Sequence, residues 1–246
     1  MTAPRNMLAE AIGTFFLCFA GIAAMLSTQA PLNSGVGLIG IALAHGLALS
    51  VAVNAFGGIS GAHFNPAVTI GMLVTGRIKL DGALQYILAQ LAGATVAAWA
   101  CQSLFPAVAV EAAQLGIPLP APDNMPGVEG AWLTVGSLCV CEFILSFLLM
   151  TAIFGTAVDS RGAAVKIGGF GIGLTVVFDI LACGPITGAS MNPARSLGPA
   201  LVYKLTGGEA GANAFNLHWC YWAAPTAGAV VAALVYDNLL LSDNEE

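Results

Sequence analysis

Long apolar stretches, separated by short polar or glycine- and proline-containing segments, make up most of this chain. Six of them are long enough to cross a bilayer as helices, because a span needs roughly 17–25 mostly apolar residues. They cover residues 7–32, 36–56, 83–110, 131–158, 167–183 and 214–236. The first is too long and too lightly charged at its start for a cleavable signal peptide, so we expect it to be a retained span.

Two further apolar stretches are shorter, and both open with the same tripeptide. The tripeptide is Asn65, Pro66 and Ala67, and again Asn192, Pro193 and Ala194. Asparagine is a favoured helix cap and proline suits the first helical position, so both tripeptides read as helix starts. A helix over residues 66–75 reaches roughly 15 Å, about half of the hydrocarbon core. We therefore expect two half-helices that enter the membrane without crossing it.

Composition and charge support a membrane protein. Hydrophobic residues are 58% of the 246, charged residues 8%, and the mean hydropathy is +0.86. If the chain crosses at each long stretch, most basic residues outside the short segments fall on one side, with Lys204 as the exception: Arg5, Arg77, Lys79, Arg161 and Lys166. The positive-inside tendency then puts both termini in the cytoplasm, and we expect a multi-pass protein of the cell membrane. The net charge of −6 offers no basic surface for nucleic acid.

The two halves of the chain repeat the same order of features. Glu10, Asn65 and Ala92-Gly93-Ala94 recur, in that order and at nearly equal separations, as Glu142, Asn192 and Ala227-Gly228-Ala229. We interpret residues 1–246 as a single domain with internal repeats of about 5–110 and 130–241, joined by a linker over 111–129. Each repeat holds three spans, so the second must be inverted and the short helices must enter from opposite faces. Their amino-terminal ends would meet at a pore or a central binding site.

Enzymatic chemistry finds no support in the sequence. The six cysteines lie in or beside apolar stretches without metal-type spacing, so we expect packed free thiols. No nucleophile, metal set or phosphate-binding loop accompanies the repeated motif. We expect neither enzymatic activity nor a cofactor.

The loops around the repeated tripeptide resemble the two signature loops of the aquaporin, or major intrinsic protein, family. They read Ser60-Gly61-Ala62-His63-Phe64-Asn65-Pro66-Ala67-Val68-Thr69 and Gly188-Ala189-Ser190-Met191-Asn192-Pro193-Ala194-Arg195-Ser196. The resemblance covers residues 9–236. It implies an all-α membrane protein with six transmembrane helices and two re-entrant half-helices in an inverted repeat, packed as the family's right-handed bundle. It also implies a passive water channel that forms a homotetramer in the lipid bilayer.

The physics of two facing helix starts agrees with that resemblance. Their partial positive charges repel cations at the pore centre, and the amides of Asn65 and Asn192 can donate to one water oxygen, which interrupts a chain of waters that would relay protons. We expect backbone carbonyls to line one wall of the pore, from Gly61, Ala62, His63, Gly188, Ala189 and Ser190.

Counting from the motif asparagines, the family resemblance puts the narrowest point at His45, Ile180, Ala189 and Arg195. Strict water channels of the family have an aromatic residue where this chain has His45, and a histidine where it has Ile180. The set instead resembles that of plant vacuolar-membrane (tonoplast intrinsic) aquaporins. We expect a wider, less polar filter that passes water and small neutral solutes such as ammonia, hydrogen peroxide or urea.

Alternative functions remain open at this point. A glycerol facilitator of the family would have an aspartate after the filter arginine, where this chain has Ser196. Glu10 and Glu142 lie inside apolar spans and could serve a proton or ion relay in a secondary transporter. The family resemblance assigns them instead as structural buried acids that accept backbone N–H groups of the re-entrant loops. Asp179 stays unassigned, facing a loop or a neighbouring subunit, and a structural membrane-junction protein is the remaining alternative.

Overall fold

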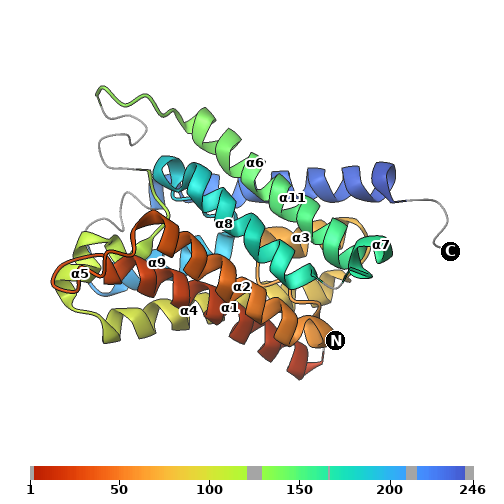
Figure 1. The fold of residues 1–246 in the computed structure, drawn as a ribbon, viewed down its shortest axis with the longest axis horizontal. Helices are drawn as coiled ribbons and strands as arrows, with labels where there is room; N and C mark the ends of the chain where they lie inside the picture. The colour runs from red at the N-terminus through yellow and green to blue at the C-terminus, as the bar shows by residue number, and fades with distance from the viewer. Residues whose placement is uncertain (1–2, 121–128, 166, 209–214, 242–246) are drawn as a thin grey trace.

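A computed structural model describes residues 3–120, 129–165, 167–208 and 215–241, and every regular element within them is helical. Six helical segments are long and apolar enough to cross a membrane (Figure 1). They are α1 (Pro4–Ser27), α2 (Gly37–Ser60), α4 (Leu80–Leu104), α6 (Val135–Ile153) with the π-helix η3 (Phe154–Val158), α8 (Gly168–Thr187), and a span over Phe215–Leu240 that holds α11 (Cys220–Val235) and the π-helix η4 (Tyr236–Leu240). The short elements are α3 (Pro66–Val74), α5 (Ala107–Ala112), η1 (Gln114–Gly116), α7 (Ser160–Ala163) and α9 (Pro193–Leu205). The prediction of six spans and two short membrane helices is confirmed.

The short helices α3 and α9 begin where the repeated tripeptide predicts. The Asn65 side chain accepts a hydrogen bond from Ala67 N at 2.9 Å, and the Asn192 side chain accepts one from Ala194 N at 3.0 Å. Each asparagine is the helix cap and each proline takes the first helical position. With nine residues, α3 is too short to span a membrane, whereas α9 continues for thirteen.

Two of the expected spans, the first and the third, differ most from the structure in where they end. The first ends at Ser27 rather than at residue 32, where the chain turns and Ser34 N donates to Ser27 O. The third starts earlier, at Leu80, and stops at Leu104 because Phe105 precedes Pro106 and adopts an extended conformation. The residues expected to complete that span form α5 instead.

Equivalent elements of the two halves pack in equivalent ways. Helix α1 packs against α2 and α4, as α6 packs against α8 and α11. The halves join where α2 meets α8, and each short helix packs against the last span of the other half, α3 on α11 and α9 on α4. Helix α1 begins and α11 ends at the same end of the bundle, as the inverted arrangement requires (Figure 1).

Small residues bring the helices of each half into close contact. A Cβ on Gly93 would overlap the Ala11 carbonyl, and one on Gly228 would overlap the Phe143 carbonyl, so α4 meets α1 as α11 meets α6. All six cysteines are free thiols, as predicted, and each is at least half-buried.

A cluster of charged residues ties the helix ends together where α1 begins and α11 ends. Arg161 pairs with Asp159 at 2.5 Å, and Arg77 pairs with Asp237 at 2.7 Å. Tyr236 Oη also donates to Asp159 Oδ2 at 3.1 Å. The hydrogen bonds from Arg161 hold the pKa of the Asp159 carboxyl well below its usual range. Lys166, expected on the same side, lies outside the described residues.

Candidate pore

The two signature loops meet inside the bundle and bind each other through their asparagines. Asn65 Nδ2 donates to Met191 O at 2.8 Å, and Asn192 Nδ2 donates to Phe64 O at 2.9 Å. Because each Oδ1 is held by its own helix start, each amide has a fixed orientation with Nδ2 turned towards the other loop. One of the two N–H groups on each Nδ2 has no acceptor among the described residues, and both asparagines line a cavity.

The carboxylate of Glu10 on α1 accepts hydrogen bonds from the first loop. Its Oε1 accepts hydrogen bonds from Ser60 Oγ at 2.6 Å and His63 N at 3.0 Å, and its Oε2 accepts one from Phe64 N at 2.7 Å. Gln90 Nε2 donates to the same oxygen at 2.8 Å. The carboxylate is fully buried, so its two oxygens are satisfied by these four donors and not by bulk water.

Glu142 of α6 holds the second loop in the same way. It accepts hydrogen bonds from Thr187 Oγ1 at 2.7 Å, Ser190 N at 3.0 Å and Met191 N at 2.8 Å. These are the contacts that the family resemblance assigns to the two buried acids. Within the described residues neither acid bonds to a second titratable side chain, which is what a relay would need.

Two tyrosines complete this support, and the sequence analysis missed them. Tyr86 Oη donates to Ser60 O at 2.7 Å, and Tyr221 Oη donates to Thr187 O at 2.5 Å. The interval between the two tyrosines equals the interval between Gly93 and Gly228. The repeated interval could therefore have identified Tyr86 and Tyr221 as equivalent residues of the two halves from the sequence alone.

A narrow cavity runs past both loops and is lined by residues of both halves. Of the six residues whose carbonyls were expected to line it, Ala62, His63, Ala189 and Ser190 are among the residues around the cavity, whereas Gly61 and Gly188 are not. The two glycines close the preceding helices in the left-handed conformation, where Gly61 N donates to Gly57 O and Gly188 N to Gly184 O. Each of these stretches therefore begins with a left-handed turn and not with extended backbone.

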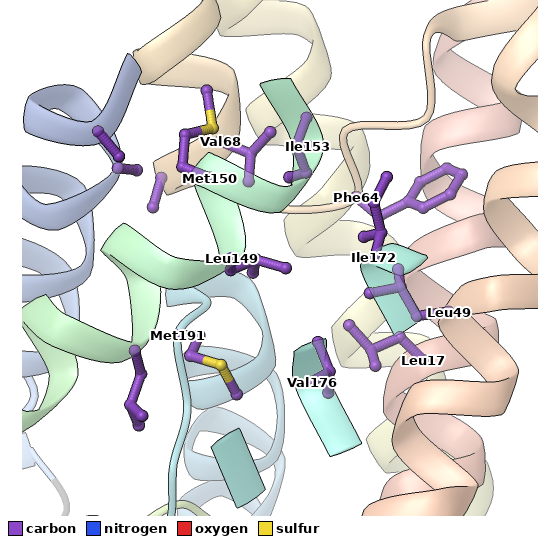
Figure 2. Close-up of a cluster of buried hydrophobic side chains, with 14 of the residues drawn as sticks. Leu17, Leu49, Phe64, Val68, Leu149, Met150, Ile153, Ile172, Val176 and Met191 are labelled. Atoms are coloured by element: carbon purple, nitrogen blue, oxygen red, sulfur yellow. The ribbon is translucent and has the colours of Figure 1, made fainter. Parts of the chain in front are cut away.

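Several apolar side chains of the spanning helices line the cavity below the signature loops. Figure 2 shows Leu149 and Ile153 of α6 across from Leu49 of α2 and Ile172 of α8. The inverted repeat relates Ile172 to His45 and Ile180 to Val53, because each pair is separated by the same interval as the two motif asparagines. The inner positions that correspond to the outer filter therefore have no polar side chain.

At the other end, the structure brings His45, Ile180, Ala189 and Arg195 together along the cavity wall. Arg195 Nη1 donates to Gly116 O at 2.7 Å, and Nη2 lies 3.3 Å from His45 Nε2. His45 Nδ1 lies 2.9 Å from Ile41 O, an oxygen that can only accept, so Nδ1 has the proton and Nε2 accepts from the arginine.

Arg195 has no carboxylate partner among the described residues, although it is buried. Its remaining acceptor is Met25 Sδ, at 3.5 Å from Nη2. Three of its five N–H groups thus have acceptors, and the other two have none among the described residues. Gly116 and Met25 were not found by sequence reasoning, because neither contact follows from a motif.

Asp179 does not reach the surface of the bundle, which rules out a neighbouring subunit, one of the two surroundings that the sequence left open for it. It is fully buried next to Ile180 in α8, and it does not line the cavity. Neither carboxyl oxygen has a hydrogen-bond partner among the described residues.

A sequence model of the Major intrinsic protein family matches residues 1–236 of this chain. The chain belongs to the major intrinsic protein family. Similar relatives include aquaporin TIP4-4 of Zea mays, which is 41% identical over 97% of this chain and 87% of that protein. Aquaporin NIP1-1 of Oryza sativa subsp. japonica is 40% identical over 95% and 73%, and aquaporin TIP2-1 of Arabidopsis thaliana is 37% identical over 98% and 89%.

The fold of this aquaporin also matches a solved structure, the aquaglyceroporin from Plasmodium falciparum. The TM-score is 0.81 with 96% of both chains covered, and the sequences are 24% identical. Such a match shows the fold and not the solute. Family and fold together identify a multi-pass membrane channel for water.

Proposed function

We propose that this aquaporin conducts water in single file along osmotic gradients, excludes protons and ions, and also passes small neutral solutes. The observation behind this is the paired asparagine arrangement: each amide is fixed by its own helix start and by the other loop, with one N–H left over the cavity. No energy source or cofactor is needed, because the solute moves down its own gradient.

Proton exclusion follows from the polarity of this centre. The starts of α3 and α9 each contribute roughly half an elementary positive charge, which opposes hydronium and other cations. A water oxygen that accepts from both amides has its hydrogens directed away from the centre on either side. A neighbouring water cannot then hand a proton through.

Solute choice is assigned to His45, Ile180, Ala189 and Arg195. The arginine repels cations and offers two free N–H donors, while the isoleucine and alanine present only apolar surface. A neutral solute with an accepting oxygen or nitrogen can bind the donors without strict matching elsewhere. Ammonia, hydrogen peroxide and urea have this character, and glycerol is the competing candidate.

The test is stopped-flow light scattering on proteoliposomes with the purified protein. The rate of osmotic shrinkage measures water permeability, and the rate of swelling under iso-osmotic gradients measures the permeability to urea, glycerol and ammonia. A pH-sensitive dye trapped inside the liposomes measures proton leak. Water flux above empty liposomes without proton leak supports the channel. Water without any added solute flux would restrict the filter to water, and glycerol flux above urea flux would favour the facilitator alternative.

We also propose that both termini face the cytoplasm of the cell membrane and that the protein forms a homotetramer. The orientation is supported by Arg77 and Arg161, which lie where α1 begins and α11 ends. Accessibility of single introduced cysteines in intact cells tests the orientation, and a tagged copy located by microscopy tests the membrane. Light scattering of the detergent-solubilised protein tests the tetramer.

A further inference from the structure

Gly21 of α1 lies directly against the ring of His45. The four proposed filter residues at the outer end of the cavity, His45, Ile180, Ala189 and Arg195, are called the outer constriction below. A Cβ on Gly21 would overlap the His45 ring at Nε2, Cε1 and Cδ2. The imidazole thus occupies the space that any side chain on residue 21 would need. Glycine in a helix interior costs about 1 kcal/mol relative to alanine, so its presence in mid-helix calls for a packing reason, and the ring supplies one.

The same helix also contacts the second polar member of the constriction. Met25, one turn after Gly21, contacts Arg195 Nη2 through its sulfur. Neither Gly21 nor Met25 lines the cavity. Gly21 and Met25 therefore set the outer limit for the imidazole and the guanidinium, without themselves touching a molecule in the pore.

The His45 ring has little freedom to adapt if that limit changes. Its Nδ1 is held by Ile41 O on its own helix, and its Nε2 by Arg195. The side chain is 3% exposed. Additional volume on α1 can only drive the ring away from α1 and towards the cavity that it lines.

The inner half of the pore provides an internal comparison. The repeat matches Ile153 to Gly21 at the interval that separates the two buried acids, and Ile172 to His45 at the interval that separates the motif asparagines. Both isoleucines line the cavity (Figure 2). At the inner level, then, α6 presents a full side chain to the pore, whereas at the outer level α1 presents none and the histidine ring lies in the vacated space.

We propose that Gly21 is a positioning residue that determines solute specificity. It sets how far the His45 ring, and with it the Arg195 guanidinium, lies back from the pore axis. The inference rests on the proposed role of these two side chains in the filter. It predicts that a single methyl group on residue 21 narrows the channel for solutes wider than water.

The test compares Gly21→Ala, His45→Ala and the double variant in proteoliposomes, with Gly58→Ala as the matched control. Gly58 is also a helical glycine, and a Cβ there would meet nothing within 4 Å. We expect Gly21→Ala to lower the ratio of urea to water permeability roughly tenfold, or about 1.4 kcal/mol at the constriction. In the His45→Ala background the same methyl group should change nothing, because the ring that it would displace is absent.

The outcomes separate this inference from the proposed function. A wild type without water flux overturns the proposed function, and an unchanged ratio in Gly21→Ala with normal water flux overturns the role of Gly21 alone. If the wild type passes no urea, the water permeabilities of the variants are compared instead. Gly21→Ala should then lower the water permeability, and it should have no effect in the His45→Ala background. If Gly21→Ala does not fold, recovery of the folded protein by added His45→Ala supports the contact, and failure of the double variant overturns it.

Discussion

Replacing Glu142 by glutamine removes an acceptor where the second loop has no substitute. The carboxylate receives Thr187 Oγ1 and Ser190 N on one oxygen and Met191 N on the other. A glutamine amide can match only one of the two backbone donors, because its NH₂ group then faces the N–H of the other. The variant keeps the shape of the side chain and changes only its hydrogen-bonding capacity.

The expected cost comes from two contributions. A buried donor left without a partner costs about 1–3 kcal/mol, and the remaining bonds lose the extra strength of a charged acceptor, so Glu142→Gln should lose roughly 2–4 kcal/mol. The substitution should also disturb the pore centre, because Met191, which loses its acceptor, itself accepts a hydrogen bond from Asn65 Nδ2 through its carbonyl. Water permeability per folded channel should therefore fall as well.

Thermal unfolding of the detergent-solubilised protein and osmotic water flux in liposomes measure these two effects. Glu111→Gln is the control, since Glu111 is exposed on α5 and the same chemical change there should alter neither quantity. Unchanged stability and water flux in Glu142→Gln would refute the anchoring role. A proton flux in the wild type that disappears in the variant would instead restore the relay alternative.

Three further predictions follow from the site and its surroundings. Asn192→Asp keeps the acceptor for the start of α9 but replaces an N–H donor by a negative charge, so proton leak in dye-loaded liposomes should rise while water flux persists. Tyr86→Phe and Tyr221→Phe each leave a buried carbonyl without its donor, and thermal unfolding should show similar losses of about 1–3 kcal/mol, whereas a loss in only one would contradict the matched roles. Arg161 lowers the folded-state pKa of Asp159, so the pair stabilises the protein at pH values above the ordinary aspartate pKa of about 3.9. This stabilisation is lost as the pH falls through the lower folded-state pKa. The difference in unfolding free energy between wild type and Asp159→Asn should thus be constant from about pH 5 to 8 and shrink below about pH 4.

The sequence was sufficient for the elements whose causes are local. Span lengths follow from the apolar stretches, and the starts of α3 and α9 follow from asparagine caps and first-position prolines. The break between α4 and α5 was also predictable, because Pro106 restricts Phe105 before it. It was missed because the surrounding residues are apolar enough to read as one continuous span.

The surroundings of the filter were not predictable in this way. The acceptor for Arg195 is the carbonyl of Gly116, far away along the chain in the connection after α5, and any residue type could supply a carbonyl. Gly21 and Met25 contact the filter only because α1 packs where it does. The hydrogen bonds of the two tyrosines likewise depend on tertiary structure, although their spacing repeats.

The reciprocal bonds between the loops bear on how the protein is made. Each asparagine donates to a carbonyl of the other half, α3 packs on α11, and α9 packs on α4. When the first half has been inserted, α3 and its polar loop still lack the partners that make non-helical backbone tolerable at membrane depth. The conducting path is therefore completed only when the last span is inserted. A chain that ends before α11 contains both buried acids and both half-helices, but α3 lacks the helix against which it packs.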